Sequence, residues 1–287
     1  MAKLTYGLIG HPVGHSLSPA MQNAAFNALK IDAEYKLFDV EPAGLQRLLG
    51  GLVKNNIAGV NVTVPHKVKT WDFIRANGIL NEHAEKLGAV NTIKVTGGKL
   101  LGFNTDGPGF YRSLVEDLKF EPEGKNIFVL GAGGAARAIV MYLGNGPREM
   151  FVADIDDCMV EELRRRFEKY YDHRRFKVVR KNDFKESLDQ SDLLVQATPL
   201  GMHDGDPSPI DPELLHSGLR IYDLVYNMPA TKLVEEASRR KMHAMTGLGM
   251  LLYQGAIAFE LWTTKKAPID VMRKALKEAL KGPGSRV

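Results

Sequence analysis

The feature that most constrains the fold of this chain is a glycine-rich turn between an apolar segment and an alanine-rich segment. Ile127–Leu130 is entirely apolar and runs directly into Gly131-Ala132-Gly133-Gly134-Ala135-Ala136. This is the pattern G-x-G-x-x-A, in which Gly131 allows a tight turn, Gly133 lets a ligand approach the backbone and Ala136 lets a helix pack closely on the strand. The N–H groups that begin such a helix bind phosphates. The pattern therefore predicts dinucleotide binding; the alternative is a tight turn in an unrelated doubly wound domain.

Short apolar runs recur after this turn at the spacing of strand–helix units. They are Met150–Ala153, Lys177–Val179, Leu193–Ala197 and Ile221–Val225. Runs of this kind are typical of parallel strands that helices cover on both faces. We therefore expect a Rossmann domain over residues 108–245.

The chain before this domain, residues 1–107, also alternates strand-like and helix-like segments. Strands are expected at 4–9, 35–40 and 59–64, helices at 19–29 and 45–53, and a hairpin at 90–103 around Gly97-Gly98. The spacing of apolar residues in 19–29 follows one helix face, and Ser18 is the expected N-cap. The fold class is thus α/β throughout, with helices again from about residue 246.

Composition excludes several classes of protein. With 287 residues, 44% of them hydrophobic and 25% charged, the chain has an ordinary globular mixture and the length of two domains. No apolar run approaches the ~20 residues that span a bilayer, and the N-terminus lacks the features of a signal peptide. The single cysteine, Cys158, allows no intrachain disulfide, and no histidine spacing indicates a metal site. We expect a cytoplasmic protein without a bound metal.

The net charge of +4 is mildly basic. Its densest contributions are Arg164–Arg166 and His173–Arg175, which are interleaved with carboxylates. This mixture predicts the solvated face of a helix, with a nucleic-acid patch as the alternative. We therefore expect the partners to be small molecules rather than nucleic acid or a membrane. The expected oligomeric state is a monomer or a homodimer.

Polar side chains gather at the ends of the elements expected in the first domain. They are Ser16, Ser18, Asn61, Thr63, Lys67, Asn91 and Asp106. Asn61 and Thr63 are two residues apart, so they lie on one face of a strand. Hydroxyls and amides around one lysine and one aspartate suit a ligand with several hydroxyls and a carboxylate. The alternatives are local: Ser18 as a helix cap and Asp106 as a turn former.

A series of motifs resembles the successive signatures of shikimate dehydrogenases, from Gly7 to about Leu280. The motifs are Ser16–Pro19, Asn61–Lys67, Gly88–Thr92, Asn104–Gly107, Gly131–Arg137, Asp223–Asn227 and Gly247–Gln254. The resemblance implies an N-terminal α/β substrate domain, completed by C-terminal helices within 246–287, that faces the Rossmann domain across a cleft. It also implies reversible oxidoreduction of shikimate and 3-dehydroshikimate in the shikimate pathway of aromatic amino acid biosynthesis, with quinate as a further candidate substrate.

The same resemblance assigns roles to individual residues. Lys67 and Asp106 would be the catalytic acid–base pair. The substrate would be held by Ser16, Ser18, Asn61, Thr63, Asn91, Tyr226 and Gln254. The cofactor would be bordered by Gly131, Ala132, Gly133, Gly134, Ala135, Leu224, Gly247 and Met250. An ammonium group at Lys67 suits this chemistry, because it can donate a proton and stabilise a developing oxyanion.

One departure from the family pattern concerns the cofactor. NADP-dependent members usually carry Asn-Arg-Thr after the second Rossmann strand, with the arginine on the 2′-phosphate, whereas this chain has Asp154-Ile155-Asp156. A carboxylate about 20 residues beyond the glycine turn accepts hydrogen bonds from the adenosine ribose and repels a 2′-phosphate. Asp154 therefore favours NAD, with NADP as the family default. The alternative is that Asp154 is only a solvated loop residue.

Two other functions fit part of this pattern. One is a folate-linked methylene dehydrogenase, which the hydroxyl-rich residue set argues against. The other is a non-catalytic module that senses NAD and a ring acid. The presence of both Lys67 and Asp106 argues against it, because a binding module does not need the pair.

Overall fold

The computed structural model describes residues 3–203 and 205–281, and these residues form two compact units. Unit 1 comprises residues 3–105 and 252–281, and unit 2 comprises 106–203 and 205–251. The functional boundaries expected from the sequence, at 107 and 246, stay a prediction.

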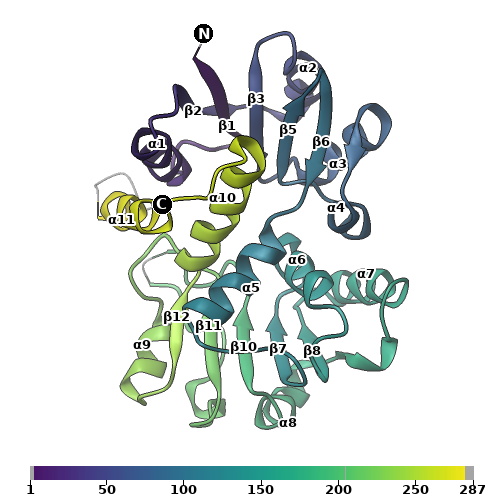
Figure 1. Cartoon of the computed structure of the whole chain (residues 1–287). Helices are drawn as coiled ribbons and strands as arrows, with labels where there is room; N and C mark the ends of the chain where they lie inside the picture. The colour runs from purple at the N-terminus through teal and green to yellow at the C-terminus, as the bar shows by residue number, and fades with distance from the viewer. Residues whose placement is uncertain (1–2, 204, 282–287) are drawn as a thin grey trace. The chain divides into compact units, whose positions relative to one another are not determined.

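Unit 1 is built on a mixed sheet of six strands in the order β2-β1-β3-β5-β6-β4 (Figure 1). Its elements are β1 (Leu4–Gly10), α1 (Ser18–Ala28), β2 (Ala33–Asp39), α2 (Leu45–Gly51), β3 (Ile57–Val62), α3 (Lys67–Asn77), β4 (Ile79–Leu80), α4 (Glu82–Leu87), β5 (Thr92–Thr96), β6 (Lys99–Phe103) and α11 (Ile269–Leu280). Strand β1 is parallel to β2 and β3, whereas β5 runs antiparallel to β3 and β6.

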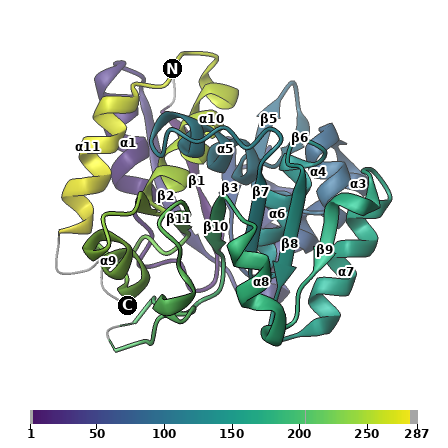
Figure 2. The same ribbon diagram turned by 90° about the horizontal axis from the view of Figure 1, so that it is seen from below.

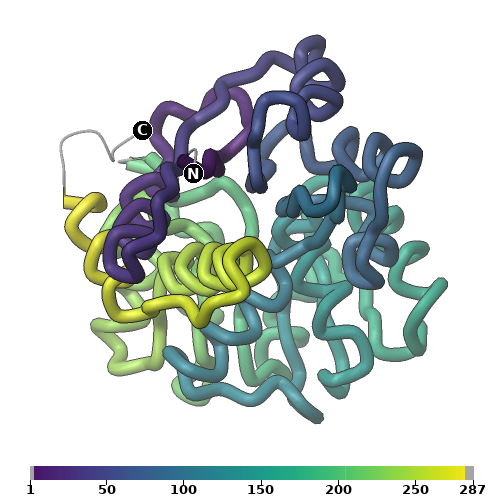
Figure 3. Tube along the Cα trace, turned by 45° about the horizontal axis from the view of Figure 1, so that its top comes forward, coloured from purple at the N-terminus to yellow at the C-terminus, as the bar shows by residue number. Residues whose placement is uncertain are grey.

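Local sequence explains the hairpin and the core of unit 1. Gly97 and Gly98 both have positive φ, +55° and +73°, the conformation that joins two antiparallel strands through a two-residue turn. Ile9, Val60 and Ile93 have no exposed surface and belong to one apolar cluster between the central strands and helices α2 and α3. At the far end of the chain, α11 packs beside α1 (Figure 3).

Unit 2 is built on a six-stranded sheet in the order β12-β11-β10-β7-β8-β9, and all its strands are parallel (Figure 2). Its elements are α5 (Asp106–Glu116), β7 (Asn126–Leu130), α6 (Gly134–Leu143), β8 (Glu149–Ala153), α7 (Asp157–Glu168), β9 (Phe176–Val178), α8 (Phe184–Asp189), β10 (Leu193–Gln196), β11 (Arg220–Asp223), α9 (Lys232–Arg239) and β12 (Ala244–Thr246). Helix α10 (Leu248–Thr263) follows and contains the boundary between the units.

In unit 2 the chain adds strands first on one side of β7 and then on the other, beginning with β10, although all the strands stay parallel. The chain proceeds from β7 outward through β8 to β9, then returns to β10 and proceeds outward on the other side. In open sheets of this kind, ligands bind beyond the carboxyl ends of the strands at such a switch point. The glycine turn follows β7, so the topology puts it at that edge.

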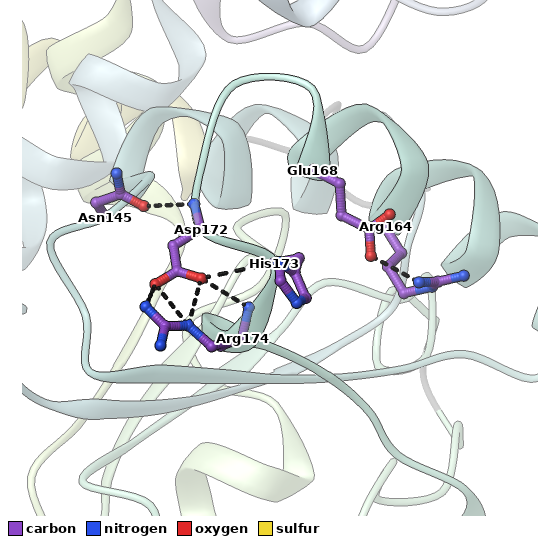
Figure 4. A network of polar contacts seen from close by, with 6 residues as sticks. All are labelled: Asn145, Arg164, Glu168, Asp172, His173 and Arg174. Carbon is purple, nitrogen blue, oxygen red and sulfur yellow. Dashed lines mark hydrogen bonds and ion pairs between the residues drawn. The ribbon is translucent and has the colours of Figure 1, made fainter.

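Arg164 and Arg174 of the basic stretches are paired with carboxylates, as Figure 4 shows. Arg164 on α7 contacts both Glu161 and Glu168, at 2.8 and 2.6 Å. Residues 173–175 are a separate short 3-10 helix rather than a continuation of the helix face that the sequence predicts. Asp172 caps this turn, and its hydrogen bonds with Arg174 hold the pKa of that carboxyl at about 2.

Two further features differ from the sequence prediction, one at a helix cap and one in the sheets. Ser18 is not an N-cap: α1 begins at Ser18, and Leu17 occupies the cap position without a side-chain hydrogen bond. Strands β4 and β12 were not expected, because each is very short and its strand conformation comes from pairing with β6 or β11.

Among the described residues, no helix combines the length and the apolarity needed to cross a bilayer.

Candidate active site

Lys67 begins α3, and four residues separate it from Val62, where β3 ends. The intervening turn is fixed at both sides, because the Thr63 N–H donates to Ile9 O at 2.8 Å and the His66 ring contacts Val40 O at 2.6 Å. A cation in the first turn lies at the positive end of the helix macrodipole, which is unfavourable for the helix itself. Helix stability therefore does not explain a lysine at this position.

Asn61 and Asn91 lie in one buried network at the ends of β3 and β5. The Asn61 amide donates to Thr92 Oγ1 at 3.0 Å, and the Thr92 hydroxyl donates to Asn91 Oδ1 at 2.9 Å. Asn91 Oδ1 also accepts from the Thr105 N–H at 2.8 Å. The network thus reaches the last residue of unit 1, whose neighbour in the chain is Asp106.

Ser16 and Ser18 form a local pair at the start of α1, in which the Ser18 N–H donates to Ser16 Oγ at 3.2 Å. Gln254 lies on α10 in the part that belongs to unit 1. The next residue, Gly255, packs directly on α1: its carbonyl accepts from Gln22 Nε2 at 2.9 Å. Unit 1 therefore brings Gln254 close to the helix that begins at Ser18.

The glycine turn of unit 2 has the two properties that dinucleotide binding needs. Gly131 has φ +111°, and a Cβ there would lie 2.8 Å from the carbonyl carbon of Ala197, which follows β10. Gly133 is the N-cap of α6, and a Cβ on Gly133 or Gly134 would meet no protein atom within 4 Å. Internal packing thus requires Gly131 but leaves open space beside the start of α6, between Gly133 and Ala135. The residues present fit a phosphate group at that helix end.

Asp154 follows β8 and is held in place by two backbone donors. Its Oδ2 accepts from the Ala132 N–H at 2.7 Å, and its Oδ1 accepts from the Asp156 N–H at 3.0 Å. Its carboxylate is thereby joined to the glycine turn, unlike that of a freely solvated loop residue. Ile155, where NADP-dependent members carry an arginine, is fully exposed.

The segments after β11 and β12 lie side by side. The Leu224 N–H donates to Gln196 O at 2.8 Å, and the Gly247 N–H donates to Val225 O at 2.9 Å. A Cβ on Gly247 would lie 2.2 Å from Leu224 O, so only glycine fits this close approach. Unit 2 therefore brings together Leu224 and Gly247, two of the residues expected to border the cofactor. Met250 is nearby in the chain, and its N–H donates to Tyr222 Oη at 3.0 Å.

Asp106 is the first residue of α5 and is buried, with 7% of its surface exposed. It is therefore a helix-start residue, a position that favours a carboxylate, rather than a turn former. Tyr226 lies in the segment after β11, and desolvation together with the negative charge of Asp106 raises the pKa of its phenol. A predicted catalytic residue and a predicted substrate ligand of unit 2 thus interact electrostatically.

Asp223 is a residue of this region to which the sequence assigned no role of its own. It ends β11, has no exposed surface, and accepts hydrogen bonds from the Thr231 hydroxyl at 2.6 Å and the Val225 N–H at 3.1 Å. Burial raises the pKa of Asp223 to about 6. The carboxyl thereby ties both ends of the segment that carries Leu224 and Tyr226. The available signal was an acid inside the otherwise apolar run Ile221–Val225.

Two family models match parts of the chain. The shikimate dehydrogenase substrate binding domain matches residues 8–93, and the shikimate 5′-dehydrogenase C-terminal domain matches residues 247–277. A curated relative, the shikimate dehydrogenase (NADP(+)) of Methanopyrus kandleri, is 44% identical over 282 residues, which cover 96% of this chain and 95% of the relative.

Solved structures match the chain over almost its whole length. A shikimate dehydrogenase in complex with NADP+ has a TM-score of 0.89 and 36% identity, covering 98% of this chain and 96% of the other. The shikimate 5-dehydrogenase of Listeria monocytogenes, in complex with shikimate and NAD, has a TM-score of 0.88 and 32% identity, covering 96% of each chain. The names of the curated relatives carry NADP(+), which does not support the expectation that NAD is preferred.

Proposed function

Because the chain belongs to the shikimate dehydrogenase family, we propose that it catalyses the reversible oxidation of shikimate to 3-dehydroshikimate with a nicotinamide dinucleotide. The observation that carries this proposal is the 44% identity to a shikimate dehydrogenase over 96% of the chain. The hydroxyl and amide groups of unit 1 and the open glycine turn of unit 2 support it.

The substrate is a ring acid with several hydroxyls, so its binding requires directional donors and acceptors. The proposed ligands are Ser16, Ser18, Asn61, Thr63, Asn91, Tyr226 and Gln254. Buried polar networks hold side chains in one orientation, because each unsatisfied group would be costly. The bonds that join Asn61, Thr92 and Asn91 therefore preorganise two of these ligands before substrate arrives.

Lys67 and Asp106 are the proposed acid–base pair. When bound, the cofactor supplies the hydride chemistry. In the reducing direction, the Lys67 ammonium stabilises the developing alkoxide and donates the proton that completes the hydroxyl. In the oxidising direction, the ring hydroxyl gives up this proton to the amine nitrogen of Lys67, and the Asp106 carboxylate orients the hydroxyl. Both residues must reach one substrate molecule. A structure with bound shikimate that places either of them beyond hydrogen-bond reach of the ring would contradict the pairing.

For the cofactor, we propose that Asp154 selects NAD. Its two oxygens each accept one backbone N–H, which fixes the carboxylate beside the glycine turn while leaving lone pairs for the ribose hydroxyls. A 2′-phosphate would meet this negative charge, and Ile155 offers it no cation. The NADP(+) in the names of relatives such as the Methanopyrus kandleri enzyme makes NADP the competing assignment.

The test is a set of initial rates with shikimate and quinate, each measured with NAD and with NADP. Turnover of shikimate, with a higher kcat/KM for NAD, is expected. Binding of cofactor and ring acid without turnover of either acid would indicate a sensing module, and turnover of a folate substrate alone would indicate the folate-linked alternative. A kcat/KM about tenfold higher with NADP than with NAD would leave the reaction standing and overturn the role of Asp154.

A further inference from the structure

We propose that Tyr35 is a positioning residue for the substrate: its buried hydroxyl holds Asn61, one of the proposed substrate ligands, in its binding orientation. The inference rests on the proposed function and adds to it a residue that never touches the substrate. All the residues that carry it belong to unit 1.

The ring of Tyr35 is fixed in the core of unit 1. Tyr35 lies on β2, only 4% of its surface is exposed, and its ring centroid is 6.1 Å from that of Trp262. Trp262 is itself anchored, because its Nε1 donates to Ile93 O at 2.9 Å. The hydroxyl at the end of this ring therefore has a fixed position.

The backbone of Tyr35 is fixed to the helix that carries Ser18. Asn23 on α1 accepts from the Tyr35 N–H at 2.8 Å and donates to the Tyr35 carbonyl at 3.1 Å. The backbone N–H and the backbone carbonyl of Tyr35 are thus both paired with the Asn23 side chain of α1. Any movement of α1 along the strand would break both bonds, so Tyr35 and Ser18 keep a constant spacing.

The hydroxyl of Tyr35 joins β2 to β3. It donates to Asn61 Oδ1 at 2.8 Å. Burial raises the pKa of the Tyr35 phenol, and the nearby Ser18 side chain partly offsets this rise. The orientation of the Asn61 amide follows from its other side, where Nδ2 faces the Asn91 carbonyl at 3.4 Å and Thr92 Oγ1 at 3.0 Å. A carbonyl can only accept, so Nδ2 must face it and Oδ1 must face Tyr35.

Loss of this hydroxyl would release the Asn61 side chain. Asn61 Oδ1 would lose a buried donor, and the amide could turn away from the orientation that the substrate meets. Restoring that orientation on binding adds an ordering cost. This effect does not concern the proton transfer or the cofactor, so binding of the substrate should weaken while its chemistry stays the same.

The experiment compares Tyr35→Phe with wild type in steady-state kinetics. We expect the KM for shikimate to rise by about three- to tenfold, the loss of one buried hydrogen bond, with kcat changed by less than about twofold and the KM for the dinucleotide unchanged. The matched control is Tyr6→Phe: Tyr6 is 3% exposed on β1, and its ring lies 5.1 Å from the same Trp262. The control should leave all three parameters near wild type. Because KM does not depend on the amount of active enzyme, partial loss of folded protein would not obscure the result.

A double-mutant cycle with Asn61→Ala separates positioning from general loosening of the fold. If Tyr35 acts through Asn61, Tyr35→Phe should raise the KM for shikimate less in the Asn61→Ala background than in wild type. Full additivity, an unchanged KM in Tyr35→Phe, or an equal rise in the KM for the dinucleotide would each overturn the proposal. Failure of the wild-type protein to turn over shikimate would instead refute the proposed function.

Discussion

The two units form their candidate ligand sites in opposite ways. In unit 1, side chains such as Asn61 and Asn91 are tied to one another by hydrogen bonds. In unit 2, the backbone of the glycine turn at Gly131 and Gly133 leaves open space at a helix N-terminus. The difference follows from what each unit has to recognise. A ring acid must be distinguished by the direction of each hydroxyl, whereas a pyrophosphate group is recognised by any correctly placed row of N–H donors.

The largest expected effect tests the side-chain part of this comparison. Lys67→Ala should lower turnover by roughly 10²–10⁴-fold, the range for loss of a positioned acid–base group, while substrate KM changes far less. Lys69→Ala is the matched control, because Lys69 is an exposed lysine in the same first turn of α3. Steady-state rates of both variants decide the matter: near-wild-type turnover in Lys67→Ala would remove this lysine from the mechanism.

The next largest expected effect tests the other half of the comparison, the claim that unit 2 binds its ligand through the backbone of the glycine turn. Gly131→Ala should lower the free energy of unfolding by about 1–3 kcal/mol from backbone strain alone, because φ is +111° and the added Cβ meets Ala197. Gly133→Ala should leave stability near wild type and raise the KM for the dinucleotide, since its Cβ meets no protein atom within 4 Å. Denaturant unfolding and cofactor kinetics of the two variants would separate these roles. Equal losses of stability in both would mean that the turn is purely structural.

Asp223 shows that unit 2 also contains a buried side-chain anchor, and this anchor depends on pH. Burial raises the pKa of Asp223 to about 6, so the folded state binds the proton more tightly than the unfolded state. The stability due to the protonated form is present near pH 4 and is lost as the pH rises through about 6. In Asp223→Asn this loss should disappear, so the unfolding free energy of the variant relative to wild type should increase by about 2 kcal/mol between pH 4 and 7.

The control for this measurement is Asp172→Asn. The pKa of Asp172 is lowered to about 2, so its contribution to stability is present above the ordinary pKa of a carboxyl and is lost as the pH falls from there through about 2. The difference in unfolding free energy between the Asp172→Asn variant and wild type should therefore stay nearly constant between pH 4 and 7. A flat difference for Asp223→Asn over the same range would show that its carboxyl is already charged throughout.

The smallest expected effect concerns Asp154, the side chain in unit 2 that would contact the adenosine ribose of the cofactor. The double change Asp154→Asn with Ile155→Arg should shift the ratio of kcat/KM towards NADP by roughly tenfold, because it removes the repulsion and adds a guanidinium. Asp156→Asn is the control: this exposed carboxylate caps α7 through the Cys158 N–H at 2.9 Å. A similar shift in the control would assign selectivity to the overall negative field rather than to Asp154.

Short-range patterns determined most of the elements in both units. The strand, turn and helix from Asn126 to Leu143 could be predicted because an apolar run, a glycine pattern and an alanine-rich segment each constrain the local backbone. The hairpin around Gly97-Gly98 followed from two consecutive glycines. Strands β4 and β12 could not be predicted, since so few residues hold a strand only through pairing with a neighbour.

The sequence by itself determined the class of fold, the family and the residue types available at the site, because motif order and local backbone preference can be read along the chain. The tertiary structure decided which of these residues act together. Tyr35 and Asn61 are 26 positions apart, and Ala132 and Asp154 are 22 apart, yet each pair shares a hydrogen bond. Such contacts depend on strand register and on helix placement, which follow from burial of the whole core rather than from any short stretch of residues.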